Sequence, residues 1–315
     1  MHTYYIQYTT DFHLIAALGA VGDLSAGKIY LIGPRTKVVD RVLGMEGVNL
    51  EFNQTDPRSP SISWKRVIKL LKCSRSNDES TIVSPFVFPF YTFLMLLEKG
   101  ERVGRIIRTD EGVGSYASMR HYYVSLRFER PNSTRLYCAA LAFLKKSAAW
   151  SVSFLRVCTE SYIFNPDLSI NKDKTQAIQA VVERLGRAKG LNGRVIYVSQ
   201  PGISQCFNSA QGYADFLRLT GNALGEMPVV KRHPADNFDY SMHGFEVVEG
   251  LPLETYQINT ATVFGFSSTA LLMAKIIGGC EQVYYINSGA AAAYYMGLSD
   301  FNKRLFKFNL TALSP

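Results

Sequence analysis

The sequence predicts an α/β protein in which two Rossmann-like units follow each other along the chain. Strand and helix patterns alternate in the first half of the 315 residues and again in the second half, and longer helical stretches separate the halves. Such alternation is typical of parallel strands joined by crossover helices. The length suits two domains of about 150 residues each.

The first half is interpreted as four strands with three helices between them. Strands are predicted where β-branched and aromatic residues form short runs, and helices where apolar residues recur with helical spacing. In chain order the elements are a strand at 3–9, a helix at 12–21, a strand at 28–33, a helix at 63–73, a strand at 81–88, a helix at 90–100 and a strand at 102–109.

Longer helical patterns at 135–150 and 174–188 connect the two halves. We therefore expect an N-terminal domain over residues 1–155 and a C-terminal domain over residues 156–315. In the second domain the alternation resumes, with strands at 193–199, 227–232, 245–249, 261–266 and 282–286 and helices at 209–223, 253–258 and 268–277.

The composition indicates a folded protein with anionic partners. Hydrophobic residues make up 47% of the chain, and the net charge of +8 is spread along it. This charge favours nucleotides, nucleic acid or a lipid surface without choosing among them. The five cysteines are widely separated and show no metal-ligand spacing, so we expect reduced thiols. No apolar run approaches the roughly 20 residues that span a bilayer, and we expect no signal peptide.

The polar residues that directly follow the predicted strands are the candidates for a functional site. In open parallel sheets, ligands bind at the carboxyl ends of the strands, where helix N-termini present free amides. Asp110, Glu111 and Gly112 follow the strand at 102–109. Adjacent carboxylates beside glycine suit general-base chemistry, and an ordinary acidic turn is the alternative.

A histidine followed by a proline comes after the strand at 227–232. An imidazole at a strand end can donate to a phosphate or protonate a leaving group near neutral pH. Pro234 restricts His233 to an extended backbone, and Lys231 raises the local positive potential. A purely structural histidine is the alternative.

Three hydroxyl residues, Ser267, Ser268 and Thr269, open the helix that follows the strand at 261–266. Hydroxyls at this place cap a helix, and together with the free amides they also form an anion site.

Two other segments carry polar residues that fit a nucleotide. Ser199, Gln200 and Pro201 end one strand and can cradle a base or a phosphate, although other strand-to-loop junctions are similar. Glu254 begins a short helix, where its carboxylate is either favoured by the helix dipole or accepts hydrogen bonds from a ribose diol.

The order and spacing of these motifs resemble a known family. An acidic pair before glycine, His-Pro about 120 residues later, a glutamate about 20 residues further on and a serine pair opening a helix are similar to the pattern of bacterial sialyltransferases. The likeness is to the lipooligosaccharide and capsule enzymes of glycosyltransferase family 52 and the related polysialyltransferases. It covers the strand-end motifs of both halves and implies a GT-B fold, two Rossmann-like domains facing each other across a cleft.

The resemblance implies a role for each motif. Glu111 would be the base that deprotonates the acceptor hydroxyl, although many relatives have aspartate there, and Asp110 with Gly112 would shape the loop. His233 would contact the CMP phosphate and serve as its general acid, and Glu254 would bind the ribose. The rest of the donor site would consist of Ser199, Gln200, Pro201, Lys231, Pro234, Ser267, Ser268 and Thr269.

The implied reaction moves sialic acid, with inversion, from CMP-sialic acid to a galactose-type hydroxyl of a surface glycan in lipooligosaccharide or capsule. The transition state resembles an oxocarbenium ion, so the enzyme must stabilise negative charge on the departing phosphate while a carboxylate takes a proton. Imidazole, hydroxyls and a helix terminus do this without a metal. The sequence contains no Asp-x-Asp motif, and we expect neither a metal nor another cofactor.

We expect the protein to work in the bacterial cytoplasm, at the inner face of the membrane. The helix predicted at 63–73 and the tail at 301–310 are basic and amphipathic, which suits either a lipid headgroup layer or packing on a sheet. Because some relatives form dimers, the resemblance also allows a homodimer. No nucleic-acid-binding signature is visible.

Two other functions stay open. Another nucleotide-dependent enzyme on the same scaffold, such as a Kdo transferase, a glycerol-phosphate transferase or a sugar-nucleotide epimerase, uses the same residue types at strand ends. A basic protein that binds nucleic acid or anionic lipid without catalysis is the third hypothesis.

Overall fold

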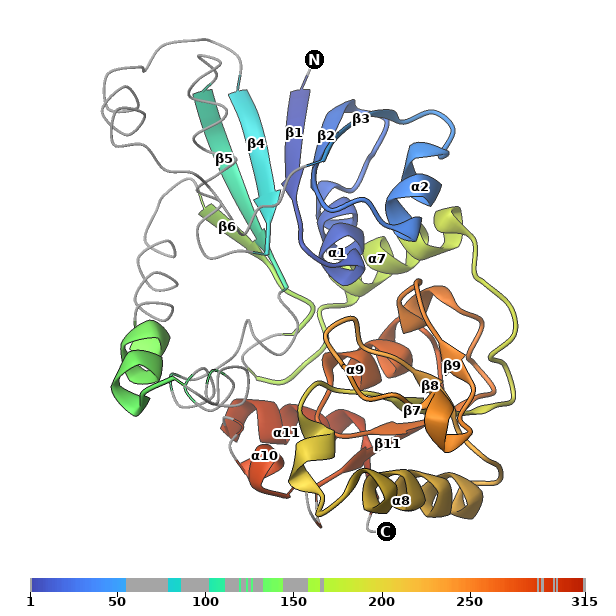
Figure 1. Ribbon diagram of the computed structural model, residues 1–315. Coiled ribbons are helices and arrows are strands. Elements are labelled where there is room, and N and C mark those ends of the chain that lie inside the picture. Colours follow the sequence, from blue (N-terminus) through green and yellow to red (C-terminus); the bar gives the residue numbers. More distant parts are fainter. Residues whose placement is uncertain are drawn as a thin grey trace. The chain divides into compact units, whose positions relative to one another are not determined.

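The computed structural model describes residues 2–54, 79–85, 102–110, 133–143, 158–164, 167–287, 292–296 and 300–313, and the single residues 119, 123, 126, 289 and 298. The chain divides into two compact units, shown in Figure 1. The first unit comprises Met1–Glu111 and Lys145–Leu185, and the second comprises Gly112–Leu144 and Gly186–Pro315.

Among the described residues, the first unit contains a six-stranded sheet with the order β3-β2-β1-β4-β5-β6, in which every neighbouring pair is parallel. The strands are β1 (His2–Gln7), β2 (Gly27–Gly33), β3 (Asn49–Gln54), β4 (Glu79–Ser84), β5 (Arg102–Thr109) and β6 (Cys158–Ser161). The helices are α1 (Asp11–Val21), α2 (Lys37–Leu43) and α7 (Lys172–Leu185).

Helix α1 begins and packs as its sequence dictates. The Thr10 hydroxyl caps it by accepting a hydrogen bond from the His13 N–H at 3.3 Å. A Cβ atom on Gly19 would lie 2.7 Å from Cγ1 of Ile178, so only glycine lets α1 approach α7 this closely. Helix α7 also packs against α2, so these three helices form one layer of the first unit.

The second unit repeats the same topology. Its described strands form a parallel sheet with the order β12-β11-β10-β7-β8-β9. The strands are β7 (Val195–Val198), β8 (Val229–Lys231), β9 (Val247–Val248), β10 (Thr262–Gly265), β11 (Gln282–Ile286) and β12 (Thr311–Leu313). The helices are α8 (Ala210–Ala223), α9 (Thr269–Ile276), α10 (Ala292–Met296) and α11 (Asp300–Asn309), with short 3-10 turns η2 (Ile203–Cys206), η3 (Ser241–His243) and η4 (Leu253–Thr255).

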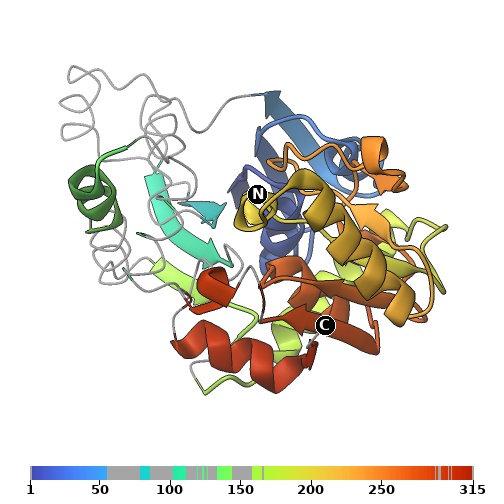
Figure 2. The ribbon, with the colours of Figure 1, turned by 60° about the horizontal axis from the view of Figure 1, so that its bottom comes forward.

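Helices cover both faces of the second sheet. Helix α8 packs on β7, whereas α9 packs on β10 and β11 and contacts α11. Figures 1 and 2 show α8 on the face of the sheet opposite to α9 and α11. Right-handed crossovers that leave a sheet in two directions produce this arrangement. Under α8 lies a core rich in aromatic rings, including Tyr197, Tyr213, Phe264 and Phe266.

The predicted α/β class and the two predicted Rossmann-like sheets are confirmed. Three edge strands, β3, β6 and β12, and the helix α2 were not predicted. Strand β6 pairs with β5, and α7 packs on α1, so the first unit extends beyond residue 155, where we expected the second domain to begin.

Several predictions lie outside the described residues. These are the helices at 63–73 and 90–100, and the site residues Glu111 and Gly112. No helix in the described part of the chain is long and apolar enough to cross a membrane.

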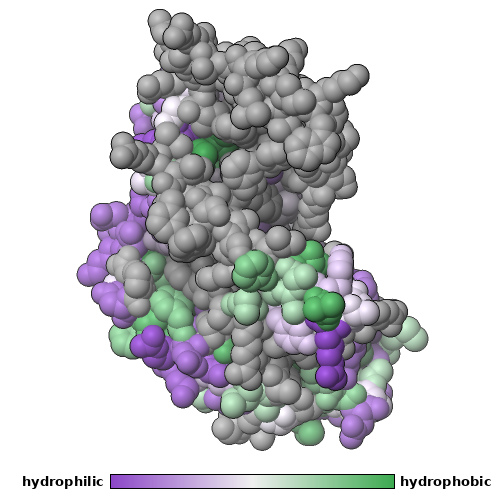
Figure 3. Space-filling view, turned by 90° about the vertical axis from the view of Figure 1, so that its left-hand side faces the viewer, coloured by the Kyte–Doolittle hydropathy of each residue, from purple (hydrophilic) through white to green (hydrophobic). Residues whose placement is uncertain are grey.

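The amphipathic tail at 301–310 is largely α11, and its apolar side is packed. Leu305 and Phe306 are fully buried, and the ring of Phe306 lies 5.9 Å from that of Tyr285. Elsewhere, the described helix at 135–143 exposes Leu136 and Phe143. On the side seen in Figure 3, hydrophobic and hydrophilic residues are interspersed. Peripheral membrane association therefore stays a prediction.

Candidate functional site

The second sheet has a topological switch point between β7 and β10. The chain continues from β7 to β8 on one side and from β10 to β11 on the other, and ligands of such sheets bind at the carboxyl ends of these two strands. Ser199 directly follows β7, and Ser267 lies just beyond β10. A Cβ atom on Gly265 would lie 2.9 Å from the Val198 carbonyl oxygen, so glycine is needed for the two strand ends to come this close.

The hydroxyls after β10 differ in what they contact. Ser268 is the N-cap of α9, and its Oγ accepts a hydrogen bond from the Ala270 N–H at 3.3 Å. Ser267 is 2% exposed, and its Oγ has no hydrogen-bond partner among the described residues. A buried hydroxyl without a partner costs roughly 1–3 kcal/mol. This hydroxyl lies beside the N-terminus of α9, where Thr269 is the first helical residue and where the helix dipole favours an anionic ligand.

The backbone of His233 is fixed from two sides at the end of β8. Its N–H donates to Oγ of Ser199 at 2.9 Å, and its carbonyl oxygen accepts from the Asp236 N–H at 2.9 Å. Ser199 is fully buried, so the structure makes it a support for His233. Pro234, which follows, is exposed.

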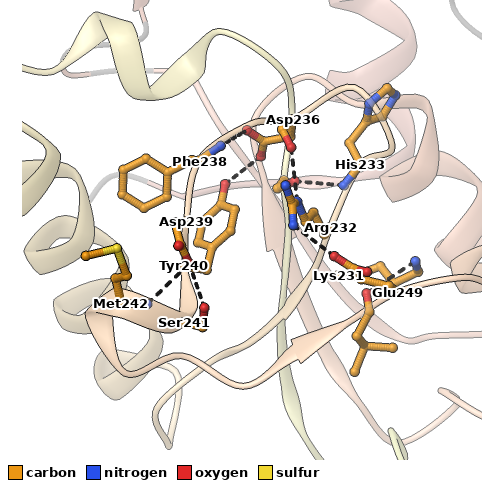
Figure 4. A network of polar contacts seen from close by, with 12 residues as sticks. Lys231, Arg232, His233, Asp236, Phe238, Asp239, Tyr240, Ser241, Met242 and Glu249 are labelled. Carbon is orange, nitrogen blue, oxygen red and sulfur yellow. Dashed lines mark hydrogen bonds and ion pairs between the residues drawn. The ribbon is translucent and has the colours of Figure 1, made fainter.

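The imidazole of His233 is held by its inner nitrogen. Nδ1 accepts a hydrogen bond from the Ala235 N–H at 3.1 Å, so the proton of the neutral ring sits on Nε2. The side chain is exposed, and Figure 4 shows the ring pointing away from Asp236 and Tyr240. The exposed ring can therefore donate a hydrogen bond from Nε2–H to a ligand.

The surroundings lower the pKa of His233 below its usual value. Desolvation by the neighbouring protein is the main cause, the Asp236 carboxylate opposes it, and Lys231 adds to it. Because the ring is exposed to solvent, we expect the lowering to be modest. The lowered pKa favours the neutral imidazole at pH 7, and the neutral ring carries a donor on Nε2.

The basic residues before His233 are engaged within the protein. Arg232 forms an ion pair with Glu249 at 2.9 Å and donates from Nε to the Asp236 carbonyl at 3.0 Å. Nζ of Lys231 lies 3.5 Å from the Val248 carbonyl oxygen. Lys231 thus contributes positive potential near His233 from a half-buried position.

Glu254 lies in η4, which packs against α9. Its side chain is 3% exposed. Arg187 ties this turn to the end of α9, since its guanidinium donates to the Glu254 carbonyl at 3.2 Å and to the Ile277 carbonyl at 3.0 Å. The residue predicted to bind the ribose and the residues after β10 predicted to bind the phosphate therefore belong to neighbouring elements of one unit. The sequence analysis missed Arg187, because its partners are backbone carbonyls distant along the chain.

The loop after β7 carries the remaining donor-site candidates. Gln200 and Pro201 are half-buried and follow Ser199 directly. Gly202 then adopts a left-handed φ of 81°, which starts the turn η2. These residues lie at the switch point between β7 and β10, and their role in binding a nucleotide stays a prediction.

In the first unit, the described part of the acidic motif is Asp110. It is 2% exposed, and its carboxylate accepts a hydrogen bond from the Ile163 N–H. This contact links the end of β5 to the segment after β6, and the loop-shaping role expected for Asp110 stays a prediction. Among the described residues, no three histidine, cysteine, aspartate or glutamate side chains are grouped to hold a metal ion.

Comparisons with known proteins find similarity in fold. No protein-family model and no curated protein sequence matches the chain. A sialyltransferase from Photobacterium damsela is 10% identical with a TM-score of 0.46, and the match covers 99% of this chain and 81% of that one. The GT-B domain of a Photobacterium damselae sialyltransferase is 10% identical with a TM-score of 0.49, and both chains are covered fully, at 100%.

E. coli ADP-heptose LPS heptosyltransferase II is 9% identical with a TM-score of 0.38, and the match covers 92% of this chain and 86% of that one. The chain is thus similar to solved bacterial sialyltransferases, the family that its motifs resemble. All three TM-scores are below 0.5, so the proposals below depend on the residues and geometry of this chain.

Proposed function

We propose that the protein is a glycosyltransferase that moves sialic acid from CMP-sialic acid to a hydroxyl of a surface glycan. The observation that carries the proposal is a pair of groups at the carboxyl edge of the second sheet that can form hydrogen bonds to a ligand. These are the Ser267 hydroxyl, which is buried and has no hydrogen-bond partner in the part of the chain that the structure describes, and the Nε2–H of the exposed His233 ring.

The spacing of these groups suits a phosphate. His233 follows β8 and Ser267 follows β10, with β7 between them. Two strand spacings amount to about 10 Å. A phosphate that accepts one hydrogen bond of about 2.8 Å on each side bridges such a gap, once the side chains extend toward it. The positive end of the α9 dipole favours the same anionic ligand.

In this mechanism the second unit stabilises the leaving CMP. As the glycosidic bond breaks, negative charge grows on the phosphate, and Nε2–H of His233 and the hydroxyls after β10 donate to it. These donors do not require a metal ion. Glu254 lies next to α9 and is proposed to accept hydrogen bonds from the ribose. Glu111, which lies outside the described residues, is proposed to take the proton of the acceptor hydroxyl.

The test is a transfer assay with CMP-sialic acid and galactosyl acceptors, with and without EDTA. We expect CMP and a sialylated product to form at equal rates in both conditions. Thermal shifts with CMP, CDP and UDP provide a second measurement, in which CMP should stabilise most. A preference for UDP, or no release of CMP with any acceptor, would contradict the proposal in favour of another nucleotide-dependent transferase or epimerase.

A further inference from the structure

A chain of buried hydroxyls runs from the core of the second unit to the turn that carries His233. The hydroxyls of Tyr197 and Tyr213 are 2.7 Å apart, and those of Tyr213 and Tyr240 are 3.0 Å apart. Tyr240 then donates to Oδ2 of Asp236 at 2.7 Å (Figure 4). None of these four side chains is more than 3% exposed.

The hydrogen bonds in this series of hydroxyls all run in one direction, toward Asp236. A carboxylate only accepts, so the proton of Tyr240 points to Asp236. The oxygen of Tyr240 is then free to accept the proton of Tyr213, whose own oxygen accepts from Tyr197. Burial is the main cause that raises the pKa of each of the three tyrosines. All three hydroxyls therefore stay protonated at any physiological pH, and the direction is kept.

The chain ends on the residue that closes the His233 turn. The Asp236 carboxylate also accepts the Phe238 N–H at 3.2 Å, and its own N–H donates to the His233 carbonyl. Ser199 holds the same turn from the end of β7, because its Oγ accepts a hydrogen bond from the His233 N–H. The imidazole is thus attached, through one turn, to the aromatic core.

We propose that Asp236 and Tyr240 are positioning residues that hold the His233 turn, so that its ring keeps the Nε2–H tautomer and direction. The effect on catalysis rests on the proposed function, whereas the effect on the ring does not. Fixed placement matters because a donor displaced by 1 Å can cost about 100-fold in rate.

The charged groups near the His233 ring determine whether its pKa should rise or fall in the variants. Asp236 raises the pKa of His233 and Lys231 lowers it, while the neighbouring Arg232 is paired with Glu249. Asp236→Asn removes the raising influence, so the titration midpoint of His233 should fall. Tyr240→Phe keeps the carboxylate and loses only its anchor, so its main effect should be on the tautomer.

The experiment is NMR of the imidazole groups in the full chain, with His233 assigned through His233→Gln. Nitrogen-15 shifts should report the Nε2–H tautomer in the wild type and a mixture of tautomers in Tyr240→Phe and Asp236→Asn. Tyr295→Phe is the control. It removes a buried hydroxyl that does not belong to the series from Tyr197 to Asp236, so it should leave the spectrum of His233 unchanged. Far-UV circular dichroism checks that each variant is folded.

Activity gives the second readout. With CMP-sialic acid as donor, Tyr240→Phe should lower kcat about 10- to 100-fold, with little change in KM. A wild-type tautomer and midpoint in both folded variants would overturn the inference. If Asp236→Asn does not fold, Tyr240→Phe alone decides the question. If the wild type shows no transfer at all, the proposed function fails while the NMR result still tests the positioning role.

Discussion

The two sheets share one strand order, yet their carboxyl ends carry different chemistry. The first sheet ends in charged groups, with the Arg108 guanidinium buried beside Glu160 at 3.4 Å and Asp110 buried after it. The second sheet ends in hydroxyls and the imidazole of His233. The same topology therefore produces two edges with different capacities. In the proposed reaction, the first edge would take the proton of the acceptor and the second would hold the nucleotide phosphate.

Each edge also leaves buried polar atoms without a hydrogen-bond partner among the described residues. These are Nε of Arg108 and Oγ1 of Thr109 in the first unit and Oγ of Ser267 in the second. Native proteins rarely keep such atoms in a packed interior without a reason. These atoms at the strand ends are the ones that substitution can test for a role in ligand binding.

The largest expected effect tests the acidic edge. Glu111→Gln keeps the size of the side chain and removes its basicity, so transfer should fall about 10²- to 10⁴-fold. CMP affinity should stay at the wild-type value, because the donor site belongs to the other unit. Steady-state transfer and calorimetric titration with CMP measure the two quantities. Normal transfer by this variant would remove the base assignment.

The next effect tests the anion-binding edge. His233→Gln retains a donor of different geometry, so kcat should fall about 100-fold as the stabilisation of the leaving phosphate weakens. His2→Gln serves as the matched control, because His2 lies in β1 of the first unit and bonds Thr81. Equal activity of the two variants would place the leaving-group site elsewhere.

Two neighbouring serines allow a sharper contrast. Ser268→Ala loses the cap of α9 and should lower the free energy of unfolding by about 1 kcal/mol. Ser267→Ala removes a buried hydroxyl that has no hydrogen-bond partner among the described residues, so the free protein should be as stable as the wild type or more stable. The same variant should bind CMP about tenfold more weakly, since it loses a hydrogen bond to a charged group.

Denaturant unfolding and calorimetry measure both serine variants. A Ser267→Ala protein that is destabilised and binds CMP normally would mean that the hydroxyl has a structural role only.

The smallest effect concerns pH. The folded state lowers the pKa of His233, so the unfolded chain binds a proton more readily. The contribution of this residue to stability is therefore full above its unfolded pKa of about 6.5, and it is lost as pH falls toward the folded pKa. His233→Gln should reduce the loss of stability as pH falls below about 6.5. An unchanged pH profile in this variant would contradict the lowered pKa.

The sequence predicted the central strands well because their apolar runs are strong. The missed strands β3, β6 and β12 lie at sheet edges, where sequences such as Cys158–Ser161 need few apolar residues and give little signal. Their pairing partners are set by the sheet as a whole.

The site was predictable in part for a similar reason. Residues that follow strands, such as His233 and Ser267, can be located from the strand pattern alone. The support of His233 could not be found in this way, because Tyr240 bonds Tyr213 through a contact that only the folded core creates. Short motifs show which groups are available, and the tertiary packing decides what holds them.

The most direct test of the central claim is the titration of the His233 imidazole by NMR, with and without saturating CMP. A phosphate dianion that accepts a hydrogen bond from Nε2 favours the charged ring, so the midpoint should rise when CMP is bound. CMP that binds while the midpoint of His233 stays unchanged would contradict the placement of the nucleotide phosphate at this edge of the second sheet.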